Sequence, residues 1–321
     1  QIHEDIVGRC LLEKDTVIGN ALVDMYVKCG ALTKAQEVLE DLPLRTMVGW
    51  SALIAGHVQI GQCHEALNCF EKMQSEGFCL DVVTFICVLK ACGDTGAVAK
   101  GKKIHLEIVG SGLLNTDIVL GNSLVDMYSK CGVLAEARES LEELLVRDVV
   151  SWNALISGYA QQGKAYEALN CFECMHIEGI VPNEVTFLCA MTACSHVGLR
   201  GEAEMLFGNM TRMYGIVPSV DHHTCMVAVY GSSGQFEKVM SVIEVIPSYD
   251  YPMLWLTLLG ACRTWGKVTL GRLAFDQIIQ LDNSCATAYA LMSHIFSASD
   301  MQEDAENVEA MRLKYAVPKK L

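Results

Sequence analysis

The sequence predicts an all-α solenoid built from pairs of short helices, and three repeated segments predict it. GNALVDMYVKCG, from Gly19, returns almost unchanged as GNSLVDMYSKCG, from Gly121, 102 positions later. The same offset relates the segments that start at Val48 and Val150, and those that start at Val82 and Glu184. A long stretch of chain has therefore been repeated, rather than one isolated motif.

One recurring valine divides the repeated stretch into units of 31, 35, 36, 31 and 35 residues. It occurs at Val17, Val48, Val83, Val119, Val150 and Val185. Units of this size bury their apolar faces only by stacking on their neighbours, which is typical of a solenoid. The 321 residues would otherwise suggest two globular domains, and the internal repeats override that expectation.

Each unit reads as two helices separated by a glycine-containing turn. In the unit that begins near Val150, two apolar stripes at helical spacing flank Gly163. The stripes are Trp152, Leu155, Ile156 and Tyr159, then Ala168, Leu169, Phe172 and Met175. Helices of roughly 12 residues would each be about 18 Å long. No segment alternates like a half-buried strand, so the sequence predicts helices throughout.

Composition narrows the possible partners without choosing one. The formal charge of −14 lowers the expectation of a nucleic-acid partner, but the distribution of basic residues over the two faces matters more than the total. The same acidic total argues against binding to anionic membranes. The 15 cysteines are odd in number and recur inside helical patterns, as Cys69 and Cys171 do, so we expect packing thiols rather than disulfides.

The first residues also belong to a repeat. IHEDIVGRCLLEKD, from Ile2, aligns with IHLEIVGSGLLNTD, from Ile104, again at an offset of 102. We therefore expect the sequence to begin inside a repeat, with any targeting segment outside it.

Two short segments together resemble a catalytic motif. His105-Leu106-Glu107 and Cys171-Phe172-Glu173-Cys174 match the two halves of a zinc-dependent nucleobase deaminase. Both halves fall in helices of different repeats, and no proline precedes Cys171. We therefore expect no metal, no cofactor and no catalytic residue.

The rotating motifs WNALISGYA, EALNCFE and VDMYxKCG, in units of 35, 36 and 31 residues, resemble pentatricopeptide repeat proteins. The alternation of three lengths resembles the P, L and S repeats of the plant organellar subclass, which implies a right-handed superhelix of helix-turn-helix repeats. The implied units are a partial L-type repeat at 1–15, an array over 16–251 (16–46, 47–81, 82–117, 118–148, 149–183, 184–219 and 220–251), and two E-type helix pairs at 252–321.

The resemblance implies that each repeat reads one base of single-stranded RNA. The fifth residue of the first helix, here called the reading residue, would act with the last residue of the repeat. The implied pairs are Asn20 with Thr46, Ser51 with Asp81, Ile86 with Asp117, Asn122 with Asp148, Asn153 with Asn183, and Leu188 with Ser219. The valine at the second position would pack between successive bases, whereas its alternative role is ordinary helix packing.

Each pair then implies a base preference. Short amides, hydroxyls and carboxylates can address the Watson–Crick edge of an unstacked base. Serine with aspartate suits guanine, asparagine with aspartate suits uracil, and asparagine with asparagine suits a pyrimidine, usually cytosine. Ile86 and Leu188 lack a polar reader, so those repeats should tolerate several bases. The implied order from 5′ to 3′ is pyrimidine, G, any, U, C or U, any.

The last S-type repeat departs from this pattern. Thr224 stands at the reading position, but Tyr251 stands where a small polar residue is expected, and Asp221 replaces the valine. Capping or packing of its own helix is an equal alternative for Thr224.

The leading hypothesis is the specificity module of a plant-type organellar C-to-U RNA editing factor, not itself an enzyme. Its partners would be single-stranded RNA rather than DNA or membrane, and a deaminase or editing-complex protein at the E-type motifs. Its place would be the mitochondrion or the chloroplast. The alternative is a helical-repeat scaffold that binds protein without RNA specificity.

Overall fold

The protein is helical throughout the part that a computed structural model describes, residues 16–246 and 250–316. These residues form 18 α-helices and one short 3₁₀ helix, η1 (Leu113–Asn115), and no strand. The all-α prediction is confirmed. The partial repeat expected at 1–15 lies outside the described residues. No helix in the described ranges has both the length and the apolar character needed to cross a membrane.

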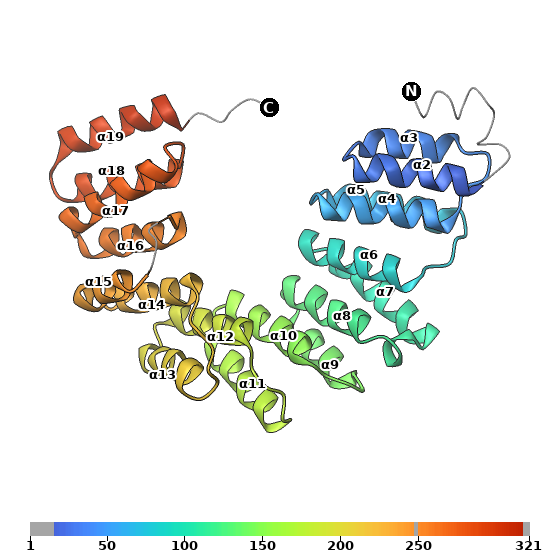
Figure 1. Ribbon diagram of the computed structural model, residues 1–321, viewed down its shortest axis with the longest axis horizontal. Helices are drawn as coiled ribbons and strands as arrows, with labels where there is room; N and C mark the ends of the chain where they lie inside the picture. Colours follow the sequence, from blue (N-terminus) through green and yellow to red (C-terminus); the bar gives the residue numbers. More distant parts are fainter. Residues whose placement is uncertain (1–15, 247–249, 317–321) are drawn as a thin grey trace. The chain divides into compact units, whose positions relative to one another are not determined.

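The helices alternate between two sets, named here the first helices and the second helices of successive pairs (Figure 1). The first helices are α2 (Thr16–Lys28), α4 (Met47–Gln59), α6 (Val82–Thr95), α8 (Ile118–Lys130), α10 (Val149–Gln161), α12 (Glu184–Val197), α14 (Val220–Ser232), α16 (Pro252–Trp265) and α18 (Ala286–Ala298). The second helices are α3 (Leu32–Asp41), α5 (Cys63–Ser75), α7 (Val98–Ser111), α9 (Leu134–Glu143), α11 (Ala165–Ile177), α13 (Arg200–Arg212), α15 (Phe236–Glu244), α17 (Val268–Leu281) and α19 (Gln302–Tyr315).

The chain divides into two units, residues 1–158 and 159–321. In the first unit α2, α4, α6 and α8 pack in sequence, each also against its own second helix. In the second unit α12, α14, α16 and α18 do the same. Each first helix thus buries its apolar residues against a partner helix and a neighbouring pair, as expected of a solenoid of helix pairs.

Glycine permits both the tight turns and the close helix packing. Gly61, after α4, has φ of 77°, a left-handed conformation that residues with a Cβ atom adopt at a cost. Gly121, on α8, faces the residue that follows the second helix of its own pair, and a Cβ atom there would lie 2.6 Å from Cδ2 of Leu144. Gly19 has the same relation to Leu42, at 2.7 Å. The repeated GN dipeptide therefore marks a site where side-chain volume is excluded.

Three cysteine positions recur at the offset of 102 residues, and both copies are buried at two of these positions. Cys69, Cys92, Cys171 and Cys194 are at most 2% exposed. Burial raises the pKa of Cys92 to about 12, so its thiol stays protonated and unreactive at neutral pH. Cys29, in contrast, is exposed, so the expectation of a packing role does not extend to it.

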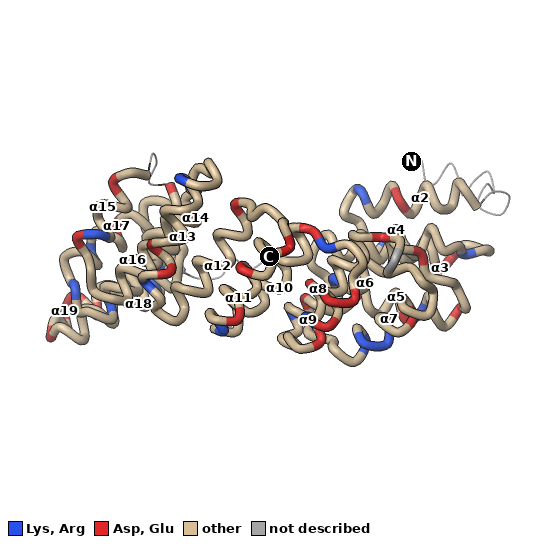
Figure 2. Tube along the Cα trace, turned by 90° about the horizontal axis from the view of Figure 1, so that it is seen from below, with Lys and Arg blue, Asp and Glu red and all other residues tan. Residues whose placement is uncertain are grey.

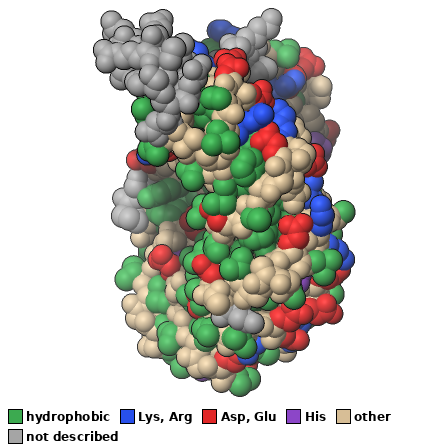
Figure 3. Space-filling view, turned by 90° about the vertical axis from the view of Figure 1, so that its right-hand side faces the viewer, with side chains coloured by type: hydrophobic (Ala, Val, Ile, Leu, Met, Phe, Trp, Pro, Cys, Tyr) green, Lys and Arg blue, Asp and Glu red, His purple; other side chains and the backbone are tan. Residues whose placement is uncertain are grey.

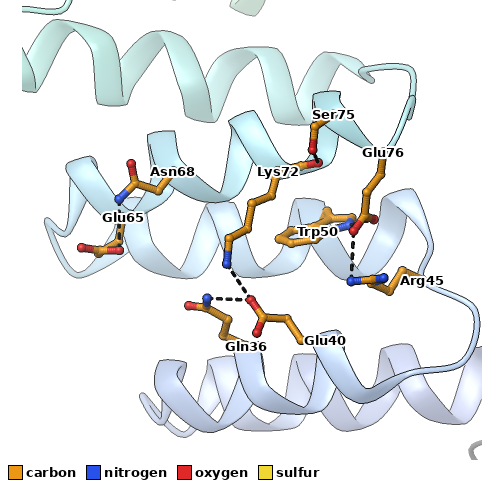
Figure 4. Close-up of polar contacts among 9 residues, drawn as sticks. All are labelled: Gln36, Glu40, Arg45, Trp50, Glu65, Asn68, Lys72, Ser75 and Glu76. Atoms are coloured by element: carbon orange, nitrogen blue, oxygen red, sulfur yellow. Dashed lines mark hydrogen bonds and ion pairs between the residues drawn. The ribbon is translucent and has the colours of Figure 1, made fainter.

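Polar contacts join neighbouring pairs along the second helices (Figure 4). Nζ of Lys72, on α5, lies 2.7 Å from Oε1 of Glu40, on α3. Nε1 of Trp50 donates to Glu76 at 3.0 Å, and the same carboxylate pairs with Arg45 at 3.0 Å. The Trp50 ring is itself fully buried, so this contact satisfies a buried donor.

Candidate nucleic-acid interface

The last residue of each predicted repeat begins the first helix of the next one. The side chains of Thr46, Asp81 and Asp117 are the N-caps of α4, α6 and α8. Their oxygens accept from backbone N–H groups of Gly49 at 3.3 Å, Thr84 at 2.8 Å and Leu120 at 3.0 Å. Ser, Thr, Asp and Asn are the preferred residues at this position because their oxygens satisfy otherwise unpaired donors.

Two of the predicted reading pairs are hydrogen-bonded to each other. Oγ1 of Thr46 donates to Oδ1 of Asn20 at 2.7 Å. Nδ2 of Asn122 donates to Oδ1 of Asp148 at 3.1 Å. Both bonds span 26 positions of sequence, so the fold itself brings each reading residue to the end of its repeat.

The Ser51 and Asp81 pair is joined through a third residue. Oγ of Ser51 lies 2.7 Å from Oγ1 of Thr84, and Thr84 in turn donates to Oδ1 of Asp81 at 2.6 Å. Thr84 is fully buried, whereas Ser51 and Asp81 are half-buried. The buried Thr84 therefore holds both half-buried residues, Ser51 and Asp81, in place.

The pair of Asn153 and Asn183 falls on either side of the boundary between the two units, so each is described by itself. Asn153 is 8% exposed on α10. Asn183 caps α12 and forms a reciprocal capping box with Thr186, with bonds of 3.0 and 3.1 Å.

The two apolar readers differ from the polar ones in lacking a side chain that could hydrogen-bond. Ile86 and Leu188 are both half-buried on their first helices. Their partners keep the capping role: Asp117 begins α8, and Ser219 begins α14. Oγ of Ser219 lies 2.7 Å from Nδ1 of the buried His222.

The hydroxyl of Thr224 forms a hydrogen bond within its own helix. Its Oγ1 donates to the carbonyl oxygen of Val220 at 2.9 Å. The neighbouring Asp221 is exposed, and Tyr251 is 39% exposed at the N-terminus of α16 without a side-chain cap. This bond does not separate the two roles expected of Thr224, and both stay predictions.

All six recurring valines are exposed, between 44% for Val185 and 70% for Val17. The set is Val17, Val48, Val83, Val119, Val150 and Val185. Buried side chains would be expected if these valines served ordinary helix packing. Figure 3 shows hydrophobic side chains spread over the middle of one face of the molecule, with charged side chains mainly along its margin.

Charged residues are concentrated on the second helices (Figure 2). Helices α4, α10 and α18 contain no Asp, Glu, Lys or Arg, whereas α9 alone carries Glu136, Arg138, Glu139, Glu142 and Glu143. Most of the acidic total of the chain is therefore carried by the second helices, and the reading side adds the carboxylates of the cap residues Asp81, Asp117 and Asp148. The first helices present a nearly neutral surface.

On α6, α10, α12 and α14 the third residue also belongs to the site, a role that the sequence did not predict, whereas α4 and α8 have Gly49 and Leu120 at this position. Thr84 and Thr186 bond the preceding cap residue, and Oγ of Ser151 accepts from the backbone N of Asp148 at 3.0 Å. A sequence signal for this role exists, because the segments DVVT, DVVS, NEVT and SVDH each place a hydrogen-bonding residue three positions after the cap residue. That is the spacing of a capping box.

The described residues contain no arrangement suited to metal catalysis. No group of three or more His, Cys, Asp or Glu among them could hold a metal ion. A shallow pocket of about 240 Å³ is lined by Lys102 and His105 on α7, Tyr128 on α8, and Glu136 and Glu143 on α9, among others. Its groups pair with each other, as Lys102 does with Glu136 at 2.6 Å, and it includes no reading residue.

Comparison with known sequences identifies related chains. The family described as PPR repeat family matches residues 45–94 and 147–196, and the PPR repeat matches residues 20–45 and 222–250. The pentatricopeptide repeat-containing protein At4g30700 of Arabidopsis thaliana is 35% identical over 302 residues, which cover 94% of this chain and 38% of the relative. The chain belongs to the pentatricopeptide repeat family.

Other pentatricopeptide repeat relatives carry organellar names. Two from Arabidopsis thaliana, At3g11460, mitochondrial, and At3g57430, chloroplastic, are each 32% identical. The matches cover 98% and 96% of this chain but 51% and 36% of those proteins. The chain thus spans about half the length, or less, of these relatives.

A solved pentatricopeptide repeat structure has the same fold. It is maize PPR10, in complex with an 18-nt psaJ RNA element, with a TM-score of 0.76 and 18% identity. The match covers 98% of this chain and 48% of that one. This likeness confirms the predicted solenoid of helical repeats.

Proposed function

We propose that this pentatricopeptide repeat chain binds single-stranded RNA and selects its bases through the reading pairs. The observation that carries the proposal is the direct bond between the two members of a pair, seen for Asn20 with Thr46 and for Asn122 with Asp148. Residues 26 positions apart are fixed in one orientation beside an exposed valine of the same helix. A base inserted there would meet polar atoms at its edge and a methyl group at its face.

The Asn122 pair has the polarity that uracil requires. Nδ2 of Asn122 donates to Asp148, and Oδ1 of Asn122 is buried and accepts no hydrogen bond from the described residues. A buried acceptor without a donor is unfavourable and becomes satisfied when a ligand supplies one. The N3–H group of uracil is such a donor. Guanine carries a comparable donor at N1–H, so this oxygen supports a base with an imino donor at that repeat, and the choice of U over G rests on the family resemblance.

The comparisons support RNA as the partner and an organelle as the site. PPR10 is solved with an RNA element, and the relatives are named mitochondrial or chloroplastic. We extend the proposal to the plant subclass with P, L and S repeats, with residues 252–321 as E-type helix pairs. The chain would then place a target cytidine for C-to-U editing, with deamination carried out by a partner.

Selection of bound RNAs from a random pool tests the proposal most directly. We expect the recovered sequences to share the order pyrimidine, G, any, U, C or U, any. The variant Asn122→Thr should move the preference at the fourth of these nucleotides from pyrimidine toward purine, and leave the other five unchanged. The control variant is Thr257→Ala, on α16 and outside the predicted array, which should leave all six preferences unchanged.

Two outcomes would contradict the proposal. One is a pool that returns no shared sequence, and the other is a shared sequence that Asn122→Thr does not change. Either result would favour the helical-repeat scaffold without RNA specificity.

A further inference from the structure

The hydroxyl of Thr84 links two residues that belong to the preceding repeat. It lies 2.7 Å from Oγ of Ser51 and 2.6 Å from Oδ1 of Asp81. The backbone N–H of Thr84 also donates to Oδ1 of Asp81, at 2.8 Å. Because Thr84 is fully buried, neither bond competes directly with solvent at that hydroxyl.

The direction of the bonds follows from counting protons. Thr84 has one hydroxyl proton, and an ionised Asp81 carboxylate can only accept. The proton of Thr84 therefore points to Asp81, since otherwise two oxygens would face each other at 2.6 Å without a proton between them. Ser51 must then donate its own proton to Oγ1 of Thr84.

This ordering turns Ser51 into an acceptor toward a ligand. Its only proton is directed at Thr84, so its lone pairs are what remain for a base. Oδ2 of Asp81, the second carboxylate oxygen, accepts no hydrogen bond from any described residue. The pair thus offers two acceptors and no donor.

Among the four RNA bases, only guanine carries two neighbouring donor groups on its Watson–Crick edge, N1–H and the N2 amino group. Adenine presents an acceptor at N1 beside its N6 amino group, and would set that acceptor against the lone pairs of Ser51. Uracil and cytosine each place a donor beside an acceptor. Two fixed acceptors therefore match guanine and leave every other base with a mismatch.

We propose that Thr84, which belongs to the next repeat, is a positioning residue that makes the Ser51 and Asp81 pair specific for guanine, an inference that rests on the proposed RNA binding. It acts by fixing the hydroxyl proton of Ser51. Without it Ser51 could rotate its proton toward N1 of adenine, and both purines would be accepted. The specificity of one repeat is thus completed by the third residue of the following helix.

The test compares two RNAs that differ only in G or A at the nucleotide assigned to Ser51, with dissociation constants measured by fluorescence anisotropy. For the wild-type chain we expect G to bind more tightly than A by about tenfold or more. Thr84→Val, which removes the hydroxyl and keeps the shape, should lower the ratio of the two constants about fivefold to tenfold. Thr84→Ser, which keeps the hydroxyl, should leave the ratio within about twofold of wild type.

A matched control separates the positioning role of Thr84 from general damage to the fold. Thr257→Val makes the same substitution on α16, outside the predicted array, and should leave the G-to-A ratio at this nucleotide unchanged. Circular dichroism and thermal melting check that each variant is folded. If Thr84→Val does not fold, Thr84→Ala takes its place with the same expectation.

The possible results are distinct. If the wild-type chain binds RNA without distinguishing bases at any repeat, the proposed function is contradicted, and so is the positioning role of Thr84. If the wild type prefers G and Thr84→Val keeps that preference, only the positioning role of Thr84 is overturned. Equal losses in Thr84→Val and Thr84→Ser would also overturn it, because the hydroxyl would then not be the cause.

Discussion

Asn122 and Asp148 are bonded side chain to side chain, and the oxygen that joins them also starts a helix. Oδ1 of Asp148 accepts from Nδ2 of Asn122 at 3.1 Å, and from the backbone N–H groups of Val150 and Ser151 at 2.9 and 3.0 Å. The last residue of a repeat therefore has two roles in one side chain. It orients the reading residue, and it caps the next first helix.

These two roles can be separated by substitution at Asp148. Asp148→Ala removes the cap and should lower the free energy of unfolding by about 1 kcal/mol. Asp148→Asn keeps a good cap and should change that free energy by no more than about a few tenths of a kcal/mol. Chemical denaturation monitored by circular dichroism measures both.

RNA binding then tests the second role. Asp148→Asn turns the pair into two asparagines, so the preference at its nucleotide should move from U toward C while stability is retained. An alanine variant as stable as wild type would contradict the capping role, whatever its effect on RNA.

The excluded volume at Gly121 predicts that one kind of substitution has opposite effects at two glycines. Gly121→Ala places a Cβ atom 2.6 Å from Cδ2 of Leu144, and should destabilise the chain by about 1–3 kcal/mol because Leu144 is buried and must shift. Gly110→Ala, late in α7, meets nothing within 4 Å and should stabilise by about 0.5–1 kcal/mol through helix propensity. Melting temperatures of the two variants and the wild type decide the matter, and a shift in the same direction for both would refute this account of the GN dipeptide.

The sequence was sufficient to predict the helix pairs because the evidence was periodic. Trp152, Leu155 and Ile156 recur at helical spacing and all prove buried. Gly163, expected in a turn, has φ of 68°, and Gly61, 102 positions earlier, has φ of 77°. Residues close in sequence determine apolar periodicity and turns, so each copy of the repeat is separate evidence for the same pair of helices.

The hydrogen bonds within the site could not be predicted from periodicity. That Asn122 faces Asp148 depends on how two helices and a turn pack, over 26 positions. The sequence named the pair only through a family resemblance. The role of Thr84 needed coordinates, because its hydroxyl bonds one residue 3 positions away and another 33 positions away.

Protonation of His222 should make stability depend on pH. Burial lowers the pKa of His222, which bonds Ser219 through Nδ1 and donates to the carbonyl of Glu184 through Nε2 at 3.0 Å. Since its folded pKa is below the ordinary value of 6.5, the unfolded chain takes up the proton first. The free energy of unfolding should therefore fall as pH drops below about 6.5, by at most about 2 kcal/mol at pH 5 from this group.

His222→Gln isolates that contribution, because glutamine can complete the same capping box without titrating. Denaturation curves at pH 7.5 and pH 5 are compared for both proteins. The wild type should lose more stability than the variant between these two conditions. Equal losses would show that His222 takes up its proton as readily in the folded chain as in the unfolded one.

The nearly neutral surface of the first helices predicts a weak dependence of RNA binding on salt. In residues 16–158, the cations of the first helices are Lys28, Lys90 and Lys130, and two of them are already ion-paired. Lys28 lies 2.7 Å from Asp24, and Lys130 lies 2.9 Å from Asp126. Few phosphates can therefore exchange their counterions for protein charges.

The slope of log K against log salt concentration measures this number. Six phosphates neutralised by side chains would give a slope of about −4 for a single strand, whereas one or two would give about −1. We expect the smaller value, with affinity depending mainly on base contacts, so that changing a preferred base should weaken binding more than raising salt from about 50 to about 200 mM. A slope of about −4 would mean that basic residues outside the first helices reach the RNA, and would move the binding surface away from the reading pairs.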